Sequence, residues 1–316
     1  MKKRIVMMGE CMVEMFQLVE NVYHQAFAGD VFNTAVYLKR SCETPVDVQF
    51  LTAVGTDLIS DKLVQTVERE NLDTRLMFRA KGASPGLYMI NTDAYGERSF
   101  VYWRDTSAAR QVMQCFSQRG SLADLSGCDM FYFSGITLAI LSDNDRHALW
   151  TLIHELKARG SRIVFDPNYR PALWSTLEHC RAAFTQAYQL ADIAMPGLDD
   201  HKVLYEHSTV QQIQAFLTEL DVGEIIIKDG KNGVVGRFAG HDFRAPAHQV
   251  KKVVDTTAAG DSFNGGYLAA RLADIPPQDA VKYAARLAGF VVEHTGAIVN
   301  KEHFQRFWSQ HRLNKF

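Results

Sequence analysis

Short apolar runs alternate with amphipathic helical patterns along most of this chain, and this alternation constrains the fold more than any other feature. Each run is short enough to be a strand buried on both faces. The runs are Arg4–Met8, Val48–Val54, Met130–Ser134, Arg162–Asp166, Asp192–Met195 and Glu224–Lys228. Helical spacing of apolar residues is present in Asn144–Arg159 and Val210–Leu220. We therefore expect an α/β fold with a doubly wound, mostly parallel sheet flanked by helices.

Two segments depart from this alternation because they carry strand patterns with no helix between them. Met12–Leu18 alternates in polarity, and Leu87–Asn91 with Arg98–Trp103 is typical of a hairpin around the turn at 93–96. Such strands cannot join a doubly wound sheet, so they predict a small separate β-sheet that acts as a lid. A further hairpin is expected within Ile225–Phe238, around two Gly-containing turns.

The expected domain division follows from these patterns. The α/β domain would comprise residues 1–10, 31–85 and 105–316, and the β-lid would comprise residues 11–30 and 86–104. An apolar lid face needs a cover, either substrate and core or the lid of another subunit. This predicts a homo-oligomer, a dimer or higher, assembled through the lid.

Composition excludes several classes of protein. Thirty-four Lys and Arg against 36 Asp and Glu give a net charge of -2, so no basic field is available to attract nucleic acid or anionic lipid. No apolar stretch approaches the roughly 18 residues of a membrane helix. The five cysteines lack any C-x-x-C pair, which argues against a disulfide framework or a zinc cluster. We expect a cytoplasmic protein whose partners are small molecules, with neither nucleic acid nor membrane among them.

The strongest chemical signal is the string D-T-T-A-A-G-D-S-F-N-G-G, which begins at Asp255. We expect a strand to end at Val254, small residues to fill the turn, and a helix to begin near Asp261. Free N–H groups of the first helical turn would bind an anion there, aided by the helix dipole. An aspartate at that position suits a base that takes a proton from an attacking hydroxyl. An ordinary Asp N-cap also fits the bare D-x-x-D spacing.

Taken whole, this string resembles the D-T-T-x-A-G-D-S-F signature of the ribokinase-like, or phosphofructokinase-B, family of sugar kinases. Ala258 departs from the glycine that is common at its position. The D-T-T-A-A-G-D variant, and the opening G-E-C-M-V-E from Gly9, are similar to those of the 2-keto-3-deoxygluconate kinases in that family. Further resemblances follow in the family's order at Ala28–Ala35, Ser134–Leu141 and Phe165–Pro171, although Ala28 replaces a glycine.

The resemblance implies a set of catalytic and nucleotide-binding residues. Asp261 corresponds to the catalytic base, and ATP with Mg²⁺ would be required. The residues assigned to the anion hole are Ala258, Ala259, Gly260 and Asp261. The residues assigned to ATP are Asn168, Lys228, Gly230 and Gly260. Lys228 also fits an ordinary solvated lysine at the end of a strand.

The resemblance also implies cation sites. The family's N-x-x-E element is replaced here by Gly197-Leu198-Asp199-Asp200, so Asp200 is expected to hold Mg²⁺ through water, with Asp199 as its competitor. Asp255 is a candidate ligand of a monovalent cation such as K⁺, because some members of the family bind such a cation.

The substrate is predicted from the lid and its neighbours. Asp30 and Asn33 offer groups matched to sugar hydroxyls, although turn and N-cap roles fit them too. Tyr102 and Arg104 lie two apart on a strand and share a face, with Tyr88 on the partner strand. A guanidinium beside phenols suits a carboxylate.

Arg170 offers a second cation for that carboxylate, and an ordinary exposed lid surface is the alternative. The expected reaction is the ATP-dependent phosphorylation of the primary hydroxyl of a sugar acid, 2-keto-3-deoxygluconate, to 2-keto-3-deoxy-6-phosphogluconate. The alternatives are a neutral-sugar or nucleoside kinase, such as a fructokinase or an aminoimidazole riboside kinase, and a catalytically silent sugar-binding or regulatory relative. The retained Asp261 argues against the silent relative, because a binding protein needs no base.

Overall fold

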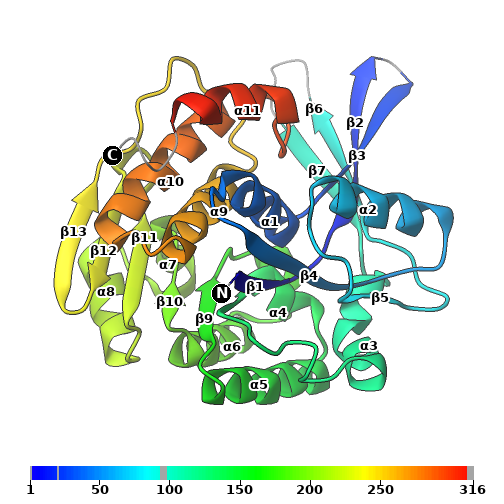
Figure 1. The fold of residues 1–316 in the computed structure, drawn as a ribbon, viewed down its shortest axis with the longest axis horizontal. Coiled ribbons are helices and arrows are strands. Elements are labelled where there is room, and N and C mark those ends of the chain that lie inside the picture. Colours follow the sequence, from blue (N-terminus) through cyan, green and yellow to red (C-terminus); the bar gives the residue numbers. More distant parts are fainter. Residues whose placement is uncertain (1, 20, 93–97, 312–316) are drawn as a thin grey trace.

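The computed structural model describes residues 2–19, 21–92 and 98–311, and it places the predicted apolar runs side by side in one sheet (Figure 1). The strand order is β13-β12-β11-β10-β9-β8-β1-β4-β5. Pairing is parallel from β11 to β5, and β12 and β13 add two antiparallel strands at one edge. The strands are β1 (Lys3–Met8), β4 (Val46–Val54), β5 (Met77–Arg79), β8 (Met130–Ser134), β9 (Arg162–Asp166), β10 (Ile193–Ala194), β11 (Glu224–Lys228), β12 (Val234–Phe238) and β13 (His241–Ala245).

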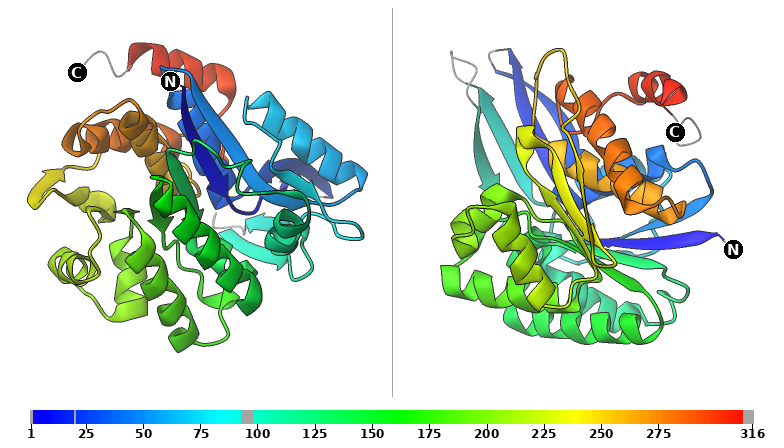
Figure 2. Two further views of the ribbon diagram at one scale, coloured as in Figure 1. Left: turned by 60° about the horizontal axis from the view of Figure 1, so that its bottom comes forward. Right: turned by 90° about the vertical axis from the view of Figure 1, so that its left-hand side faces the viewer.

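Helices cover both faces of this sheet, as Figure 2 shows in its right-hand view. Alternate residues of β1 point to opposite faces, so Ile5 and Met7 join one apolar core and Val6 and Met8 join the other. The first core is covered by α1 (Asp30–Ser41), α2 (Leu58–Arg69), α9 (Ala259–Leu272), α10 (Pro277–Val292) and α11 (Lys301–Gln310). The second is covered by α3 (Val112–Arg119), α4 (Gly135–Ile140), α5 (Asp143–Ala158), α6 (Leu177–Leu190), α7 (Leu198–Tyr205) and α8 (Val210–Glu219). Short 3-10 turns are η1 (Ala108–Gln111), η2 (Pro171–Leu173) and η3 (Gly230–Asn232).

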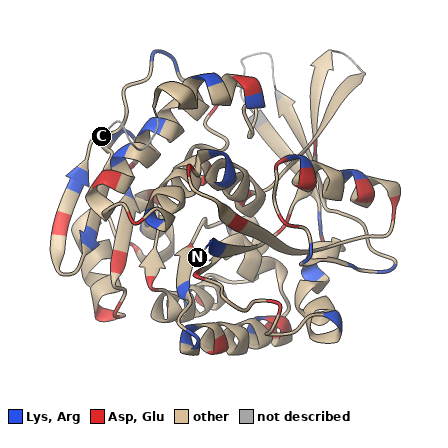
Figure 3. Cartoon of the chain, viewed as in Figure 1, with Lys and Arg blue, Asp and Glu red and all other residues tan. Residues whose placement is uncertain are grey.

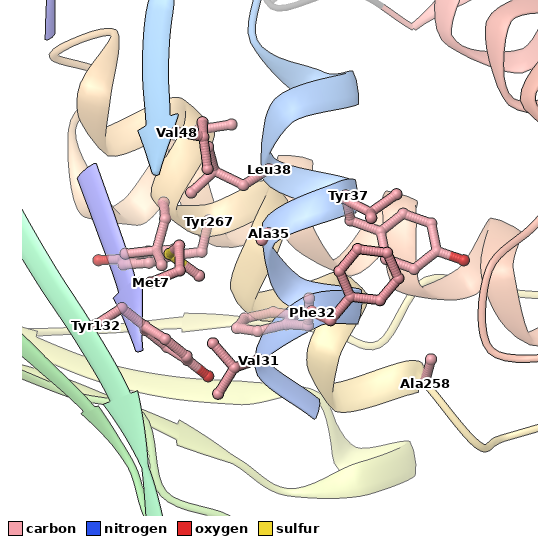
Figure 4. Packing of buried hydrophobic residues seen from close by; sticks show 14 of the residues in the cluster. Met7, Val31, Phe32, Ala35, Tyr37, Leu38, Val48, Tyr132, Ala258 and Tyr267 are labelled. Carbon is pink, nitrogen blue, oxygen red and sulfur yellow. The ribbon is translucent and has the colours of Figure 1, made fainter. Parts of the chain in front are cut away.

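Helices α1 and α9 pack closely against each other above the sheet. Gly265 makes this approach possible, since a Cβ atom there would lie 2.7 Å from both the Leu38 nitrogen and the Thr34 oxygen. Figure 4 shows the surrounding core, to which Val31 and Phe32 of α1 and Tyr267 of α9 contribute side chains. This contact brings the N-termini of the two helices together at one end of the sheet.

A buried ion pair attaches α9 to strand β11. The Arg271 guanidinium donates to both carboxylate oxygens of Glu224 at 2.9 Å, and the Tyr267 hydroxyl donates to the same carboxylate. All three side chains are buried. Because α9 begins at the candidate anion hole and β11 ends at Lys228, this pair fixes the two elements that carry the site.

The lid is a second sheet with the order β3-β2-β6-β7, and it projects from the main body (Figure 1). Its strands are β2 (Met12–Val19), β3 (Val22–Ala28), β6 (Leu87–Thr92) and β7 (Arg98–Trp103). β2 pairs antiparallel with β3 and parallel with β6, and β6 pairs antiparallel with β7. The sequence does not predict β3, because its first four residues are all exposed at the sheet edge and show no alternation. The predicted turn at 93–96 lies outside the described residues.

One expected boundary needs correction. The prediction of a strand ending at Val254 is wrong: residues 246–258 form no helix or strand, and the Val254 N–H donates to the carbonyl of Val292, the last residue of α10. Helix α9 begins at Ala259, two residues before Asp261, which agrees with the expected start near Asp261. The predicted hairpin is confirmed as β11 and β12, while β13 is an additional strand.

All five cysteines are free, and four of them are buried, so there is no disulfide framework. Among the described residues, no helix combines the length and apolar character needed to cross a bilayer.

Candidate active site

The candidate site lies at the carboxyl ends of the parallel strands, where the strand order reverses between β1 and β8. Open α/β sheets bind ligands at such a reversal point. Asp166 ends β9 and Lys228 ends β11, while the N-termini of α1 and α9 supply Asp30 and Asp261 from the helix layer. Residues far apart in the sequence therefore meet at one edge of the sheet.

Asp261 lies in the first turn of α9 and is held by Asn33 of α1, whose amide donates to its Oδ2 at 2.8 Å. Burial raises the pKa of Asp261 well above its usual value, and the negative charge of Asp30 raises this pKa further. The hydrogen bond from Asn33 and the charge of Lys228 act in the opposite direction. A carboxylate in this environment has a high proton affinity, as a general base requires.

The backbone donors of residues 258–261, where the sequence predicts an anion hole, are not all free. The Ala259 N–H donates to the Thr256 carbonyl at 3.2 Å and is therefore already used. Within the described residues, the N–H groups of Ala258, Gly260 and Asp261 have no protein acceptor, as expected at the start of a helix. Three rather than four backbone donors are available to an anion.

Lys228 lies beside this turn. A Cβ atom added to Gly260 would be 3.9 Å from the Lys228 ammonium. The ammonium therefore lies close to the first turn of α9. The ammonium is 3.1 Å from the Asp166 carboxylate and donates to Asn264 Oδ1 at 3.3 Å. Gly230, which the sequence assigns to ATP, lies in the exposed turn after β11 with a φ of 50°.

Asp30 and Asn168 form a second contact across the site. The Asn168 amide donates to Asp30 Oδ2 at 3.1 Å, and Asn168 has a φ of 31°, a region that asparagine tolerates better than most residues. Burial raises the pKa of Asp30, against the hydrogen bonds from Ser134 and Asn168. The sequence assigned Asp30 to the sugar and Asn168 to the nucleotide, and the structure brings the two side chains together.

Asp200 lies at the same edge, on the first turn of α7, and accepts from the Tyr169 N–H at 3.3 Å. Burial and the negative charge of Asp166 raise the pKa of Asp200 to about 6. The neighbouring Asp199 is exposed. Arg170 is also exposed, and it is close enough to Asp200 for its charge to lower that pKa.

The remaining predicted cation ligand, Asp255, is engaged by protein donors. One carboxylate oxygen accepts from the N–H and hydroxyl of Thr257, at 3.0 and 2.6 Å, and the other accepts from the Gly296 N–H at 2.7 Å. Asp255 thus braces the turn that precedes α9. In the part of the chain that the structure describes, no group of three or more His, Cys, Asp or Glu side chains is placed to hold a metal ion.

The lid brings together the aromatic and cationic residues that the sequence assigns to the substrate. The Tyr88 and Tyr102 rings are 5.8 Å apart, and the Arg104 guanidinium lies 5.9 Å from the centre of the Tyr102 ring. This confirms that Tyr102 and Arg104 share a face. Their exposure differs, because Tyr102 is 49% exposed and Arg104 is only 6% exposed.

Two buried glutamates complete the lid site, and the sequence analysis does not anticipate either of them. Glu10 forms an ion pair with Arg104, and Glu14 accepts a hydrogen bond from the Tyr88 hydroxyl. Glu10 Oε1 and Arg104 Nε are buried and have no hydrogen-bond partner among the described residues. The available signal was the opening string G-E-C-M-V-E from Gly9, which contains both glutamates.

Asn264 is the other functional residue that sequence reasoning misses. It is fully buried and contacts Asp166, Lys228 and the Tyr132 hydroxyl. Its position within the signature string was a signal, but Asn in a helix beside glycines also suits simple packing.

Comparison with known proteins identifies the family. The profile of the pfkB family carbohydrate kinases matches residues 2–303. The chain is 38% identical over 306 residues to the 2-dehydro-3-deoxygluconokinase of Escherichia coli, covering 96% of this chain and 99% of the relative. It is 36% identical over 302 residues to the enzyme of the same name from Haemophilus influenzae, covering 95% and 96%.

Solved structures agree on the fold. The structure of a fructokinase with bound ATP from Xylella fastidiosa superposes with a TM-score of 0.83 at 21% identity, covering 98% of this chain and 99% of that one. The chain belongs to the pfkB family of carbohydrate kinases and has the ribokinase-like fold.

The environment of Asp261 predicts opposite effects of Asp261→Asn on catalysis and stability. Loss of a general base lowers kcat by about 10²–10⁴-fold. The pKa of Asp261 is higher in the folded protein than in the unfolded chain, so the folded protein retains a proton that the unfolded chain releases. Its contribution to the free energy of unfolding therefore falls as the pH rises from about 4 towards the folded-state pKa.

We expect Asp261→Asn to raise the free energy of unfolding at pH 7 by about 0.5–2 kcal/mol, with the gain vanishing near pH 4. Steady-state kinetics and thermal unfolding across this pH range measure both effects. The exposed Glu219→Gln serves as the control and should change neither. A variant with a tenth or more of the wild-type kcat would exclude Asp261 as the base.

Proposed function

We propose that this protein transfers the γ-phosphoryl group of ATP to the primary hydroxyl of 2-keto-3-deoxygluconate, the compound also called 2-dehydro-3-deoxygluconate. The observation that carries this proposal is the juxtaposition at the start of α9. A carboxylate of high proton affinity, Asp261, lies in the same helical turn as free backbone donors and beside the Lys228 ammonium. A base next to an anion site is what phosphoryl transfer to a hydroxyl requires.

In the proposed reaction, Asp261 accepts the proton of the sugar hydroxyl as its oxygen bonds to the γ-phosphorus. The bond from that phosphorus to the β,γ-bridging oxygen breaks, and ADP leaves. The N–H groups of residues 258, 260 and 261 and the Lys228 ammonium would stabilise the negative charge of the transferring group. Asn33 keeps Asp261 oriented through its 2.8 Å hydrogen bond.

The residues at the sheet edge are compatible with Mg²⁺. Asp200 offers carboxylate oxygens, which Mg²⁺ prefers. Burial and then the negative charge of Asp166 raise its pKa, and a divalent cation would offset the repulsion from Asp166. We propose that Asp200 holds the ion through water, and Mg²⁺ would supply charge neutralisation on the phosphates. The proposal of K⁺ at Asp255 rests on the family resemblance alone.

Two independent features support a sugar acid as the substrate. The relatives at 36–38% identity are named for that substrate, and the match covers nearly their whole length. In the lid, the Glu10 and Arg104 pair has one unused acceptor and one unused donor, both buried. Buried polar groups without partners cost about 1–3 kcal/mol each, so a ligand carrying a carboxylate and a hydroxyl would be bound favourably there.

A coupled assay of ADP release tests the proposal directly. We expect 2-keto-3-deoxygluconate to be phosphorylated with the highest kcat/KM in a panel that also contains gluconate, fructose, ribose and aminoimidazole riboside. Mass spectrometry should identify the 6-phosphate. A preference for fructose or a nucleoside would replace the proposal with a neutral-substrate kinase, and transfer to no acceptor would indicate a silent relative.

The carboxylate assignment predicts a selective effect of Arg104→Lys. Lysine keeps the charge but loses the planar fork that can serve Glu10 and a ligand together. KM for the sugar acid should rise about 10- to 100-fold, because charge-assisted hydrogen bonds are worth about 1.5–3 kcal/mol. KM for ATP and the kinetics of poor neutral sugars should stay within a factor of about two.

Arg170→Lys is the matched control, since Arg170 is exposed and lies on the Asp200 side. If Arg170→Lys gives the selective loss and Arg104→Lys does not, the carboxylate binds at Arg170. Equal losses for acidic and neutral substrates would assign Arg104 to the lid fold instead.

We also propose a cytoplasmic enzyme that assembles through its lid. The free, mostly buried cysteines suit a reducing compartment. The projecting lid strands are almost free of charged residues in Figure 3, and Leu18, Val19 and Val22 at their tip are 49–63% exposed. An exposed apolar sheet of this kind is typical of an interface.

Light scattering should therefore give at least a dimer for the wild type. The double variant Leu18→Glu with Val22→Glu places charge on the proposed interface and should shift the equilibrium to the monomer. A wild-type monomer with full activity at assay concentrations would contradict assembly through the lid.

A further inference from the structure

We propose that Asn264 is a positioning residue for Lys228, which it holds at the start of α9 against the pull of Asp166, to which Lys228 also donates at 3.1 Å. This inference rests on the proposed kinase function. Asn264 lies one turn after Asp261 on α9, so it points from the same helix face into the space below the candidate anion hole. Its side chain is fully buried, and solvent cannot replace the contacts it makes.

The hydrogen bonds of Asn264 fix the orientation of its amide. Nδ2 donates to Asp166 Oδ2 at 2.7 Å and to the Tyr132 hydroxyl at 3.2 Å, while Oδ1 accepts from the Lys228 ammonium at 3.3 Å. Both donor hydrogens and the acceptor are thus used. A flipped amide would place its NH₂ group against an ammonium and its oxygen against a carboxylate, so only this orientation is favourable.

Tyr132 anchors this arrangement to the centre of the sheet. It lies on β8, is fully buried, and appears beside α1 in Figure 4. Burial and the negative charges of Asp166, Asp30 and Asp261 raise its pKa well above the usual value, so the phenol stays neutral and its oxygen can accept from Asn264.

The amide acts on Lys228 in two ways. Lys228 is 3.1 Å from Asp166, the opposite charge that competes with a phosphate for its ammonium. Asn264 donates to the other oxygen of that carboxylate, which weakens the attraction, and its own oxygen provides a second partner for the ammonium. Without the amide, the Lys228 ammonium would move closer to Asp166. It would then move away from the first turn of α9, where it now lies 3.9 Å from the position of a Cβ atom built on Gly260.

The test is a double-mutant cycle between Asn264→Ala and Lys228→Met. In the wild-type background, Asn264→Ala should lower kcat about 10- to 100-fold, the loss expected for one charge-assisted hydrogen bond. KM for the sugar should change by less than a factor of about two. In the Lys228→Met background, the same substitution should change kcat by less than about twofold, because the residue through which it acts is gone.

Asn33→Ala is the matched control, since Asn33 is a buried amide that acts on Asp261 rather than on Lys228. Its effect on kcat should persist in the Lys228→Met background. Equal losses from Asn264→Ala with and without Lys228 would show a merely structural role and overturn the proposal, as would an unchanged kcat.

Two further measurements keep the inference testable. Asn264→Asp has the same shape, so it tests the position even if the alanine variant fails to fold, and a wild-type kcat for it would contradict the proposal. If the wild type transfers phosphate to no acceptor, the proposed function fails by itself. The same double-mutant cycle is then measured as calorimetric Kd values for ATP. Losses of ATP affinity that are not additive support the positioning of Lys228 by Asn264, and additive losses overturn it.

Discussion

The burial of several carboxylates together at one edge of the sheet is the constraint on which the candidate site depends. Asp30, Asp166 and Asp261 come from α1, β9 and α9; burial raises the pKa values of Asp30 and Asp261, and the charges of the neighbouring carboxylates raise them further. Lys228 is the cation that directly pairs with this group, through Asp166. Buried negative charges close together destabilise the protein when no ligand is bound. Binding of a proton or a cation at this site relieves that cost.

Three asparagines make this arrangement tolerable. Asn33 donates to Asp261, Asn168 to Asp30 and Asn264 to Asp166, at 2.8, 3.1 and 2.7 Å. A neutral amide satisfies a carboxylate oxygen without cancelling its charge, whereas an arginine would neutralise it. The carboxylates therefore remain oriented, and they are available to accept a proton or to interact with the cation that accompanies ATP. The close contact of α1 with α9 and the Glu224–Arg271 pair hold the helices that carry these groups.

The sequence predicts the layers of the fold well because buried strands and amphipathic helices each leave a periodic pattern. It fails where tertiary contacts decide the outcome. The first half of strand β3 is exposed and its residues do not alternate, so pairing with β2 makes it a strand, and Val254 forms a backbone hydrogen bond to the last residue of α10 rather than joining a sheet. For the site, motif spacing locates Asp261, Lys228 and Asp200. It could not show that Arg104 is buried against Glu10, because ion pairing across the lid depends on residues 94 positions apart.

The claim on which this account depends is that burial, reinforced by the neighbouring carboxylate charges, gives Asp261 its high proton affinity. Carboxyl-selective carbon NMR, with a pH titration of the wild type and of Asp261→Asn, measures this directly. The account predicts a carboxyl resonance that titrates well above the usual aspartate pKa of about 4, disappears in Asp261→Asn, and moves to lower pH when Asp30→Asn removes the neighbouring charge. An Asp261 resonance that titrates near the ordinary value, or one indifferent to Asp30, would contradict it.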